Sequence, residues 1–182
     1  MVSLRILRGL AAALLLIAGC AGAARTPEVQ YEPTPFDVAQ AMLELAAVGA
    51  GDLVADLGCG DGRIVIEAAR RFGARGLCVD IDPRRIAEAR RNAAAAGVAE
   101  RITFLNQDLF TVELRGVTAV MLFLSPAFNL KLRPKLEREL APGARVVSHW
   151  HDMGDWPPAR TVRIRSDGRE RPVYLWVMSA AR

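Results

Sequence analysis

Short apolar runs alternate along residues 34–149 with longer segments in which apolar residues recur at helical spacing. The short runs have the length of buried strands, and the longer segments have the period of helices. The predicted strands are 53–56, 76–80, 102–106, 119–124 and 144–149, and the predicted helices are 34–48, 63–72, 82–96 and one that ends near 140. This alternation is typical of a parallel sheet that is covered by helices on both faces.

Several helix boundaries have capping signals. Thr34 followed by Pro35 resembles a helix start, with Thr34 as the N-cap. Asp82 followed by Pro83 predicts the start of the helix over 82–96. Pro134 obscures the start of the last helix, because proline disrupts a helix interior.

The end of the chain departs from this alternation. Residues 160–165 and 174–178 have strand character, and the Asp167-Gly168 pair between them is typical of a tight hairpin turn. The 182 residues suit one domain, and the chain shows no internal repeat. The predicted fold class is therefore α/β, with a C-terminal antiparallel hairpin.

The first 24 residues have the order of a secretory signal. Arg5 and Arg8 precede an apolar run over residues 10–18, which ends at small residues and is too short for a comfortable membrane span. Residues 17–20 resemble a bacterial lipobox, in which Cys20 would be lipidated after cleavage, whereas residues 21–23 offer an ordinary cleavage site. An uncleaved membrane anchor and a start codon assigned too far upstream are the other interpretations. We expect export or membrane anchoring, with membrane contact through this segment.

Composition and charge narrow the function classes. Hydrophobic residues make up 52% of the chain and charged residues 24%, which excludes a disordered chain. The formal net charge is +4, and it falls to +2 without Arg5 and Arg8. This small, scattered excess gives no reason to expect a nucleic-acid partner.

Two further cysteines, Cys59 and Cys78, fall in a predicted loop and a predicted buried strand. Two cysteines without a recognised spacing do not form a disulfide framework. We therefore expect them to be small apolar core residues, unless the fold brings them together.

The strand over 53–56 leads into a glycine-rich turn, Gly58-Cys59-Gly60-Asp61-Gly62. The dinucleotide fingerprint G-x-G-x-x-G is absent, because Arg63 stands where the third glycine would be. The pattern is instead Asp56-x-Gly58-x-Gly60-x-Gly62, which resembles the first motif of class I S-adenosylmethionine-dependent methyltransferases. This resemblance covers roughly residues 50–180. It implies a Rossmann-like, seven-stranded, doubly wound sheet of order 3-2-1-4-5-7-6, with strand 7 antiparallel.

The resemblance also assigns a cofactor, S-adenosyl-L-methionine, and the residues that bind it. In this class an acid at the end of the second strand, here Asp80, accepts both ribose hydroxyls. An acid after the third strand, here Asp108, meets the adenine amino group, and the glycines let the backbone approach the methionyl part. The implied cofactor-binding residues are Asp56, Gly58, Cys59, Gly60, Gly62, Asp80, Ile81, Asp108 and Leu109.

Residues 31–35 and 56–66 are similar to one subgroup of this class. That subgroup comprises bacterial relatives of the mitochondrial lysine methyltransferases that modify the adenine nucleotide translocase and the ATP synthase c subunit. The similarity implies transfer of a methyl group to an amino nitrogen, with a protein lysine, and a membrane protein, among the acceptors. The expected organisation is a targeting segment over 1–24, a linker and pre-domain segment over 25–36, and a methyltransferase domain over 37–182.

The acceptor side offers candidates but no firm catalytic residue. Methyl transfer from a sulfonium depends mostly on positioning and desolvation, so no nucleophile–base pair is expected. Ser125 begins a loop that weakly echoes the (D/N/S)-P-P-(Y/F) motif of amino-group methyltransferases, and Asn129 and His149 are the other candidates. We expect no metal site, since His149 and His151 near Asp152 and Asp155 are too few ligands. Trp150 and Trp156 are expected in packing or in a pocket lid.

The predicted cofactor and the predicted export of the chain conflict. S-adenosylmethionine is a cytosolic metabolite, whereas the first 24 residues indicate export. The alternative hypothesis is an exported, non-catalytic module with a retained nucleoside or S-adenosylmethionine pocket. Loss of the acids would favour that alternative, yet Asp56, Asp80 and Asp108 all remain, and we therefore favour the enzyme.

Overall fold

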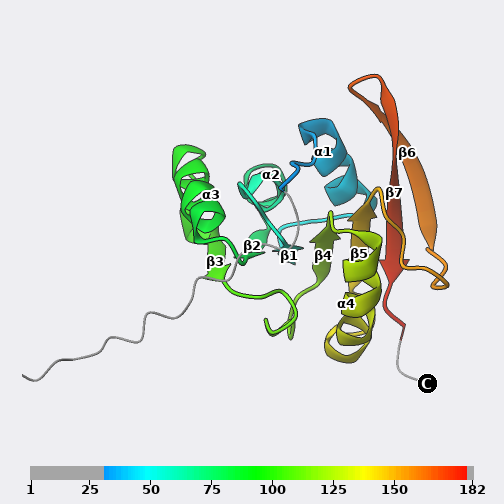
Figure 1. Cartoon of the computed structure of the whole chain (residues 1–182). Coiled ribbons are helices and arrows are strands. Elements are labelled where there is room, and N and C mark those ends of the chain that lie inside the picture. The colour runs from blue at the N-terminus through cyan, green and yellow to red at the C-terminus, as the bar shows by residue number, and fades with distance from the viewer. Residues whose placement is uncertain (1–30, 180–182) are drawn as a thin grey trace, which may run out of the picture.

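A computed structural model describes residues 31–179 of the chain, so the targeting segment and Cys20 lie outside the described residues (Figure 1). A single seven-stranded sheet has the order β3-β2-β1-β4-β5-β7-β6. Strands β1 to β5 are parallel, and β7 runs antiparallel to both β5 and β6. The predicted fold class and strand order are confirmed. The elements are α1 (Phe36–Leu45), β1 (Leu53–Leu57), α2 (Arg63–Phe72), β2 (Arg75–Asp80), α3 (Pro83–Ala95), a 3-10 turn (Ala99–Arg101), β3 (Ile102–Asn106), β4 (Ala119–Leu122), α4 (Pro126–Glu139), β5 (Arg145–His149), β6 (Arg160–Ser166) and β7 (Arg169–Val177).

The helices form two layers on the sheet. Figure 1 shows α1, α2 and α3 along one face and α4 on the other. Alternate strand residues point to opposite faces: Met121 packs in the cluster with α1, while its neighbour Leu122 packs in the cluster with α4. The buried strands β1, β2, β4 and β5 read as nearly continuous apolar runs because both of their faces are covered. No helix among residues 31–179 is long and apolar enough to cross a membrane.

Several boundaries differ from the prediction, most of all that of β7, which begins at Arg169 rather than at residue 174. Helix α1 ends at Leu45, and its N-cap position is Pro35 rather than Thr34. The Thr34 hydroxyl lies 3.3 Å from Nδ1 of His149 instead, so a long-range contact replaces the expected local cap. Helix α4 begins at Pro126, whose missing N–H is not needed in the first helical turn. Pro134 therefore lies inside α4 rather than near its start.

Two other local signals, the Asp82 cap and the Asp167-Gly168 turn, are confirmed. The Asp82 carboxyl accepts a hydrogen bond from the Arg84 N–H at 2.9 Å, as an N-cap does. Asp167 and Gly168 have φ values of 48° and 75°, so both central residues of the β6–β7 turn are left-handed. This is the turn geometry for which an Asp-Gly pair is selected.

Candidate functional site

The glycine-rich loop lies at the carboxyl ends of the parallel strands, where it joins β1 to α2. Gly58, Gly60 and Gly62 have φ values of 88°, 54° and 80°, which glycine adopts without strain. The backbone N–H groups of Gly58 and Cys59 donate to the Val79 carbonyl at 2.8 and 3.0 Å. A Cβ on Gly62 would lie 2.9 Å from the Cβ of Ala89, so glycine is also needed for the close approach of α3.

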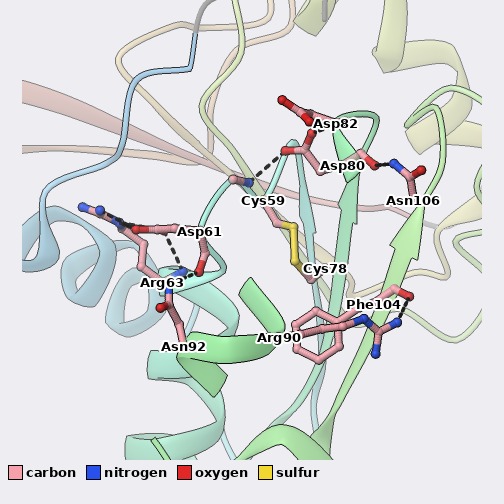
Figure 2. The surroundings of a disulfide bond; sticks show 11 residues. Cys59, Asp61, Arg63, Cys78, Asp80, Asp82, Arg90, Asn92, Phe104 and Asn106 are labelled. Atoms are coloured by element: carbon pink, nitrogen blue, oxygen red, sulfur yellow. Dashed lines mark hydrogen bonds and ion pairs between the residues drawn. A yellow bond between two sulfur atoms is a disulfide. The ribbon is translucent and has the colours of Figure 1, made fainter. Parts of the chain in front are cut away.

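Asp80 ends β2 with its carboxylate already oriented (Figure 2). One carboxylate oxygen accepts the Gly60 N–H at 2.9 Å, and the other accepts the Asp82 N–H at 2.9 Å. The Asn106 amide of β3 donates to the carbonyls of Asp80 and Ile81 at 3.0 and 2.9 Å. The turn after β2 is therefore held from both neighbouring segments, and each Asp80 oxygen keeps a lone pair for a further donor.

Asp56 is a buried carboxyl at the end of β1. Burial raises its pKa to about 8, and the nearby negative charges of Asp80 and Asp61 add to this effect. Within the described part of the chain, no ion pair or hydrogen bond to its side chain offsets that cost. A buried carboxyl without a partner fits a site that receives a cationic ligand group.

Asp108 lies two residues beyond β3 and shapes the loop there. Its carboxylate accepts the Phe110 N–H at 2.9 Å, and its carbonyl accepts the Thr111 hydroxyl at 2.9 Å. The following Leu109 is partly buried against the core. Because Asn106 pairs with Asp80 in the sheet, the loop that contains Asp108 starts beside the end of β2. The structure thus brings the three predicted acids to three neighbouring strand ends.

The cysteines contradict the expectation of two separate core thiols. Cys59 and Cys78 form a disulfide, with their Cα atoms 5.3 Å apart (Figure 2). Both are buried in the apolar cluster between the sheet, α2 and α3. They meet because the parallel register places Cys78 opposite Asp56, three residues before Cys59.

Tyr31 lies against the glycine-rich loop, a contact that the sequence did not predict. Its ring covers Gly60, since a Cβ there would lie 2.2 Å from the ring atom Cε2. The Arg85 guanidinium lies 4.1 Å from the centre of the same ring. Arg63 donates to the Thr34 carbonyl at 2.9 Å, so residues 31–34 cross over the glycine-rich loop. The similarity of residues 31–35 to the subgroup was the one available signal.

His149 ends β5 and is fully buried. Nδ1 faces the Thr34 hydroxyl, the ring centre lies 4.1 Å from that of Phe123, and Nε2 has no hydrogen-bond partner. Burial lowers the pKa of His149 to about 4, with further contributions from Arg171 and His151. The imidazole is therefore neutral at pH 7, and with Nδ1 facing Thr34 it can present Nε2 as an acceptor.

Asn129 and Ser125 lie on the α4 side. Asn129 is fully buried, and its amide nitrogen lies within hydrogen-bond distance of the Ser148 hydroxyl and of the carbonyls of His151 and Asp152. It thereby fixes the turn after β5, while His149 points to the opposite face of the sheet. Ser125 occupies the N-cap position of α4 without a side-chain capping bond.

The residues after β5 serve mainly in packing. The Trp156 and Trp176 rings lie 5.8 Å apart, and Asp155 pairs with Arg133. Trp150 has a φ of 71°, and its side chain is 39% exposed. Among residues 31–179, no group of three or more His, Cys, Asp or Glu side chains could hold a metal ion.

The chain is similar in sequence to known methyltransferases. Residues 56–160 match the model of the ANTKMT methyltransferase domain. A protein-lysine N-methyltransferase of Saccharolobus islandicus is 42% identical over 84% of this chain and 95% of its own length. The mouse adenine nucleotide translocase lysine N-methyltransferase is 35% identical over 85% of this chain and 67% of its own.

A solved structure shows the same architecture. It is described as an RNA methyltransferase from Salinibacter ruber in complex with S-adenosyl-L-homocysteine. It is 48% identical, has a TM-score of 0.79, and covers 82% of this chain and 95% of its own. That solved chain holds S-adenosyl-L-homocysteine, which is the cofactor after loss of its methyl group. This ligand agrees with the glycine-rich loop and the acids of the present site.

Proposed function

This chain belongs to the ANTKMT methyltransferase family, and we propose that it methylates the side-chain amine of lysine in a protein. It is an S-adenosylmethionine-dependent methyltransferase; the acceptor is the proposed part. The observation that carries the proposal is the 42% identity over 95% of a relative named for protein-lysine methylation. Identity over nearly the whole relative includes both the cofactor side and the acceptor side of the fold.

The cofactor fits the residues present. The glycine-rich loop has no side chains at three positions, so its backbone can approach the methionyl part of the cofactor. Asp80 is oriented to accept the two ribose hydroxyls, and the unpartnered Asp56 fits the ammonium. Bound S-adenosylmethionine supplies an activated methyl group. The contribution of the chain is then to position the acceptor and exclude water.

The acceptor is proposed to approach His149. This residue lies beside Phe123, which follows β4, and its neutral ring does not repel an incoming ammonium group. Its Nε2 lacks a partner but is buried, so it can accept an N–H hydrogen bond from an amine once the side chains that cover it move aside. Asn129 lies on the other face of the sheet, where its amide nitrogen holds the turn after β5, so we assign it a structural role.

We expect His149→Phe to lower the rate of methyl transfer about tenfold or more, because one hydrogen bond to the acceptor amine is lost. The aromatic ring keeps the contact with Phe123, and the affinity for S-adenosylhomocysteine should stay within twofold. Initial rates with labelled cofactor and a calorimetric titration measure the two quantities. His151→Phe is the matched control and should retain the rate. An unchanged rate in His149→Phe would remove this residue from the acceptor side.

RNA is the second candidate acceptor, because the 48% identical solved structure is described as an RNA methyltransferase. Two arginines beside the glycine-rich loop could suggest phosphate contacts, but each is paired with an acid. Arg63 lies 2.6 Å from Asp61, and Arg85 lies 2.6 Å from Glu88. Binding to phosphates relies on free cations, so these pairs favour a protein acceptor.

The test supplies labelled S-adenosylmethionine to the enzyme together with membrane proteins, soluble proteins or RNA from the same cells. We expect label in protein, recovered after hydrolysis as methyllysine, and none above background in RNA. The Asp80→Ala variant serves as the negative control in each reaction. Label in a methylated nucleoside would refute the lysine proposal and leave the methyltransferase activity established.

A further inference from the structure

The disulfide joins the middle of the cofactor-binding loop to the strand that ends at Asp80. Cys59 stands between Gly58 and Gly60, and Cys78 precedes Asp80 by two residues. Figure 2 shows the bond between the glycine-rich loop and β2, on the same side of the view as Asp80. A covalent link therefore connects the glycine-rich loop to the strand whose end would hold the cofactor ribose.

Apart from the disulfide, three backbone N–H groups of the glycine-rich loop donate hydrogen bonds to β2. The N–H groups of Gly58 and Cys59 bond the Val79 carbonyl, and the Gly60 N–H bonds Asp80. The loop also contains three left-handed glycines within five residues. Glycine has more accessible conformations than any other residue, so an untethered loop has freedom to lose when ligand binds, within the limits set by the Tyr31 ring over Gly60 and by α3 beside Gly62.

We propose that the Cys59–Cys78 disulfide is a positioning element of the cofactor site, so that the oxidised chain binds the cofactor more tightly than the dithiol chain. Reduction by a dithiol breaks one S–S bond. Two electrons and two protons pass to the cysteines, giving two thiols, and the reductant becomes a cyclic disulfide. The loop then regains its freedom, and cofactor binding must order it again.

We expect the fold to persist without the bond. Both sulfurs are surrounded by the apolar cluster that includes Val65, Ile86 and Ala89, which also accepts two thiols. Strands β1 and β2 remain paired over five positions. Loss of the disulfide should therefore act on the loop and leave the sheet intact.

Thermodynamic linkage predicts a second effect, which a disulfide without influence on cofactor binding would not show. If oxidation tightens cofactor binding by a given factor, bound cofactor must stabilise the disulfide by the same factor. Cys59 is 4% exposed and Cys78 is fully buried, so a reductant reaches them only when the loop opens. Bound S-adenosylhomocysteine should slow that opening.

The test uses the full chain with Cys20→Ser, so that Cys59 and Cys78 are the only cysteines. The dissociation constant for S-adenosylhomocysteine is measured by calorimetry before reduction, after reduction and after reoxidation, with thiols counted each time. We expect reduction to raise it about tenfold, as loss of preorganisation does, and reoxidation to restore it. The ratio of dithiol to disulfide in a redox buffer should shift by the same factor when ligand is added.

The double variant Cys59→Ala/Cys78→Val is the control, because both replacements suit the apolar cluster. It should bind like the reduced chain, ignore reductant and keep the far-ultraviolet circular dichroism of the parent. Equal dissociation constants in the oxidised and reduced states would overturn the proposal, as would free thiols in air-oxidised protein. The readout is ligand binding alone, so the result does not depend on whether lysine is the acceptor.

Discussion

Asp80→Ala should weaken the binding of S-adenosylhomocysteine by at least about 100-fold, because two charge-assisted hydrogen bonds to the ribose are lost. The substitution also leaves the Gly60 and Asp82 N–H groups without their acceptor, so the turn and the loop lose their shared anchor. Calorimetric titration of the ligand into each protein measures the change. Thermal unfolding without ligand shows whether the variant still folds.

Asp82→Ala is the matched control for this prediction. It removes the same charge two residues away, but the Asp82 carboxylate serves α3, where it caps the Arg84 N–H and pairs with the Arg84 side chain. We expect stability to fall by about 1 kcal/mol through loss of the cap, with binding reduced no more than threefold. If both variants lost affinity equally, the effect would come from disruption of the turn and not from ribose contacts.

The parts of this site that the sequence predicted have local causes. The glycine-rich turn, the Asp82 cap and the Asp167-Gly168 turn are each specified by residues within a few positions of one another. The helix over 63–72 was predicted from its apolar spacing with the bounds it has in the structure, where a glycine in the left-handed conformation stands at each end. Local propensity and hydrophobic period therefore sufficed for the frame that carries the cofactor loop.

The missed features depend on the register of distant segments. The disulfide joins residues 19 positions apart, and it forms because β1 and β2 pair with Asp56 opposite Cys78. The contact between Thr34 and His149 spans 115 positions and displaced the local cap predicted for Thr34. Neither register nor such contacts leave a trace in local periodicity. The resemblance of residues 31–35 to a known subgroup pointed to this segment, and the structure supplied its contacts.

Cofactor binding should release a proton from Asp56. In the ligand-free protein the pKa of this carboxyl is about 8, because the site is buried and faces other acids. An ammonium beside it favours the ionised form, so affinity for S-adenosylhomocysteine should rise with pH between 6 and 8, by up to about tenfold per unit. Titrations in two buffers of different ionisation enthalpy measure the released proton. Asp56→Asn should bind weakly with no such pH dependence.

The same raised pKa sets the sign of a stability effect. The folded state holds the Asp56 proton more tightly than the unfolded chain, whose value is near 3.8. Its stabilising contribution is complete below that value and is lost as the pH rises through about 8. The loss is at most about 1.4 kcal/mol per pH unit. Ligand-free Asp56→Asn should therefore unfold at a higher temperature than the parent at pH 8, although it binds ligand less well.

Asp52, at the other end of β1, is the control of opposite sign. Burial alone would raise the pKa of Asp52, but hydrogen bonds from the Thr118 hydroxyl and the Gly49 N–H, together with Arg145, hold it below its usual value. Asp52→Asn should lower the unfolding temperature at pH 8 and leave ligand affinity and its pH dependence as in the parent. An Asp→Asn substitution should raise stability and weaken ligand binding only where the carboxyl lacks a partner in the ligand-free protein and pairs with a cationic group of the ligand. If Asp56→Asn destabilised the ligand-free protein as Asp52→Asn does, Asp56 would be a structural residue and the ammonium would be held elsewhere.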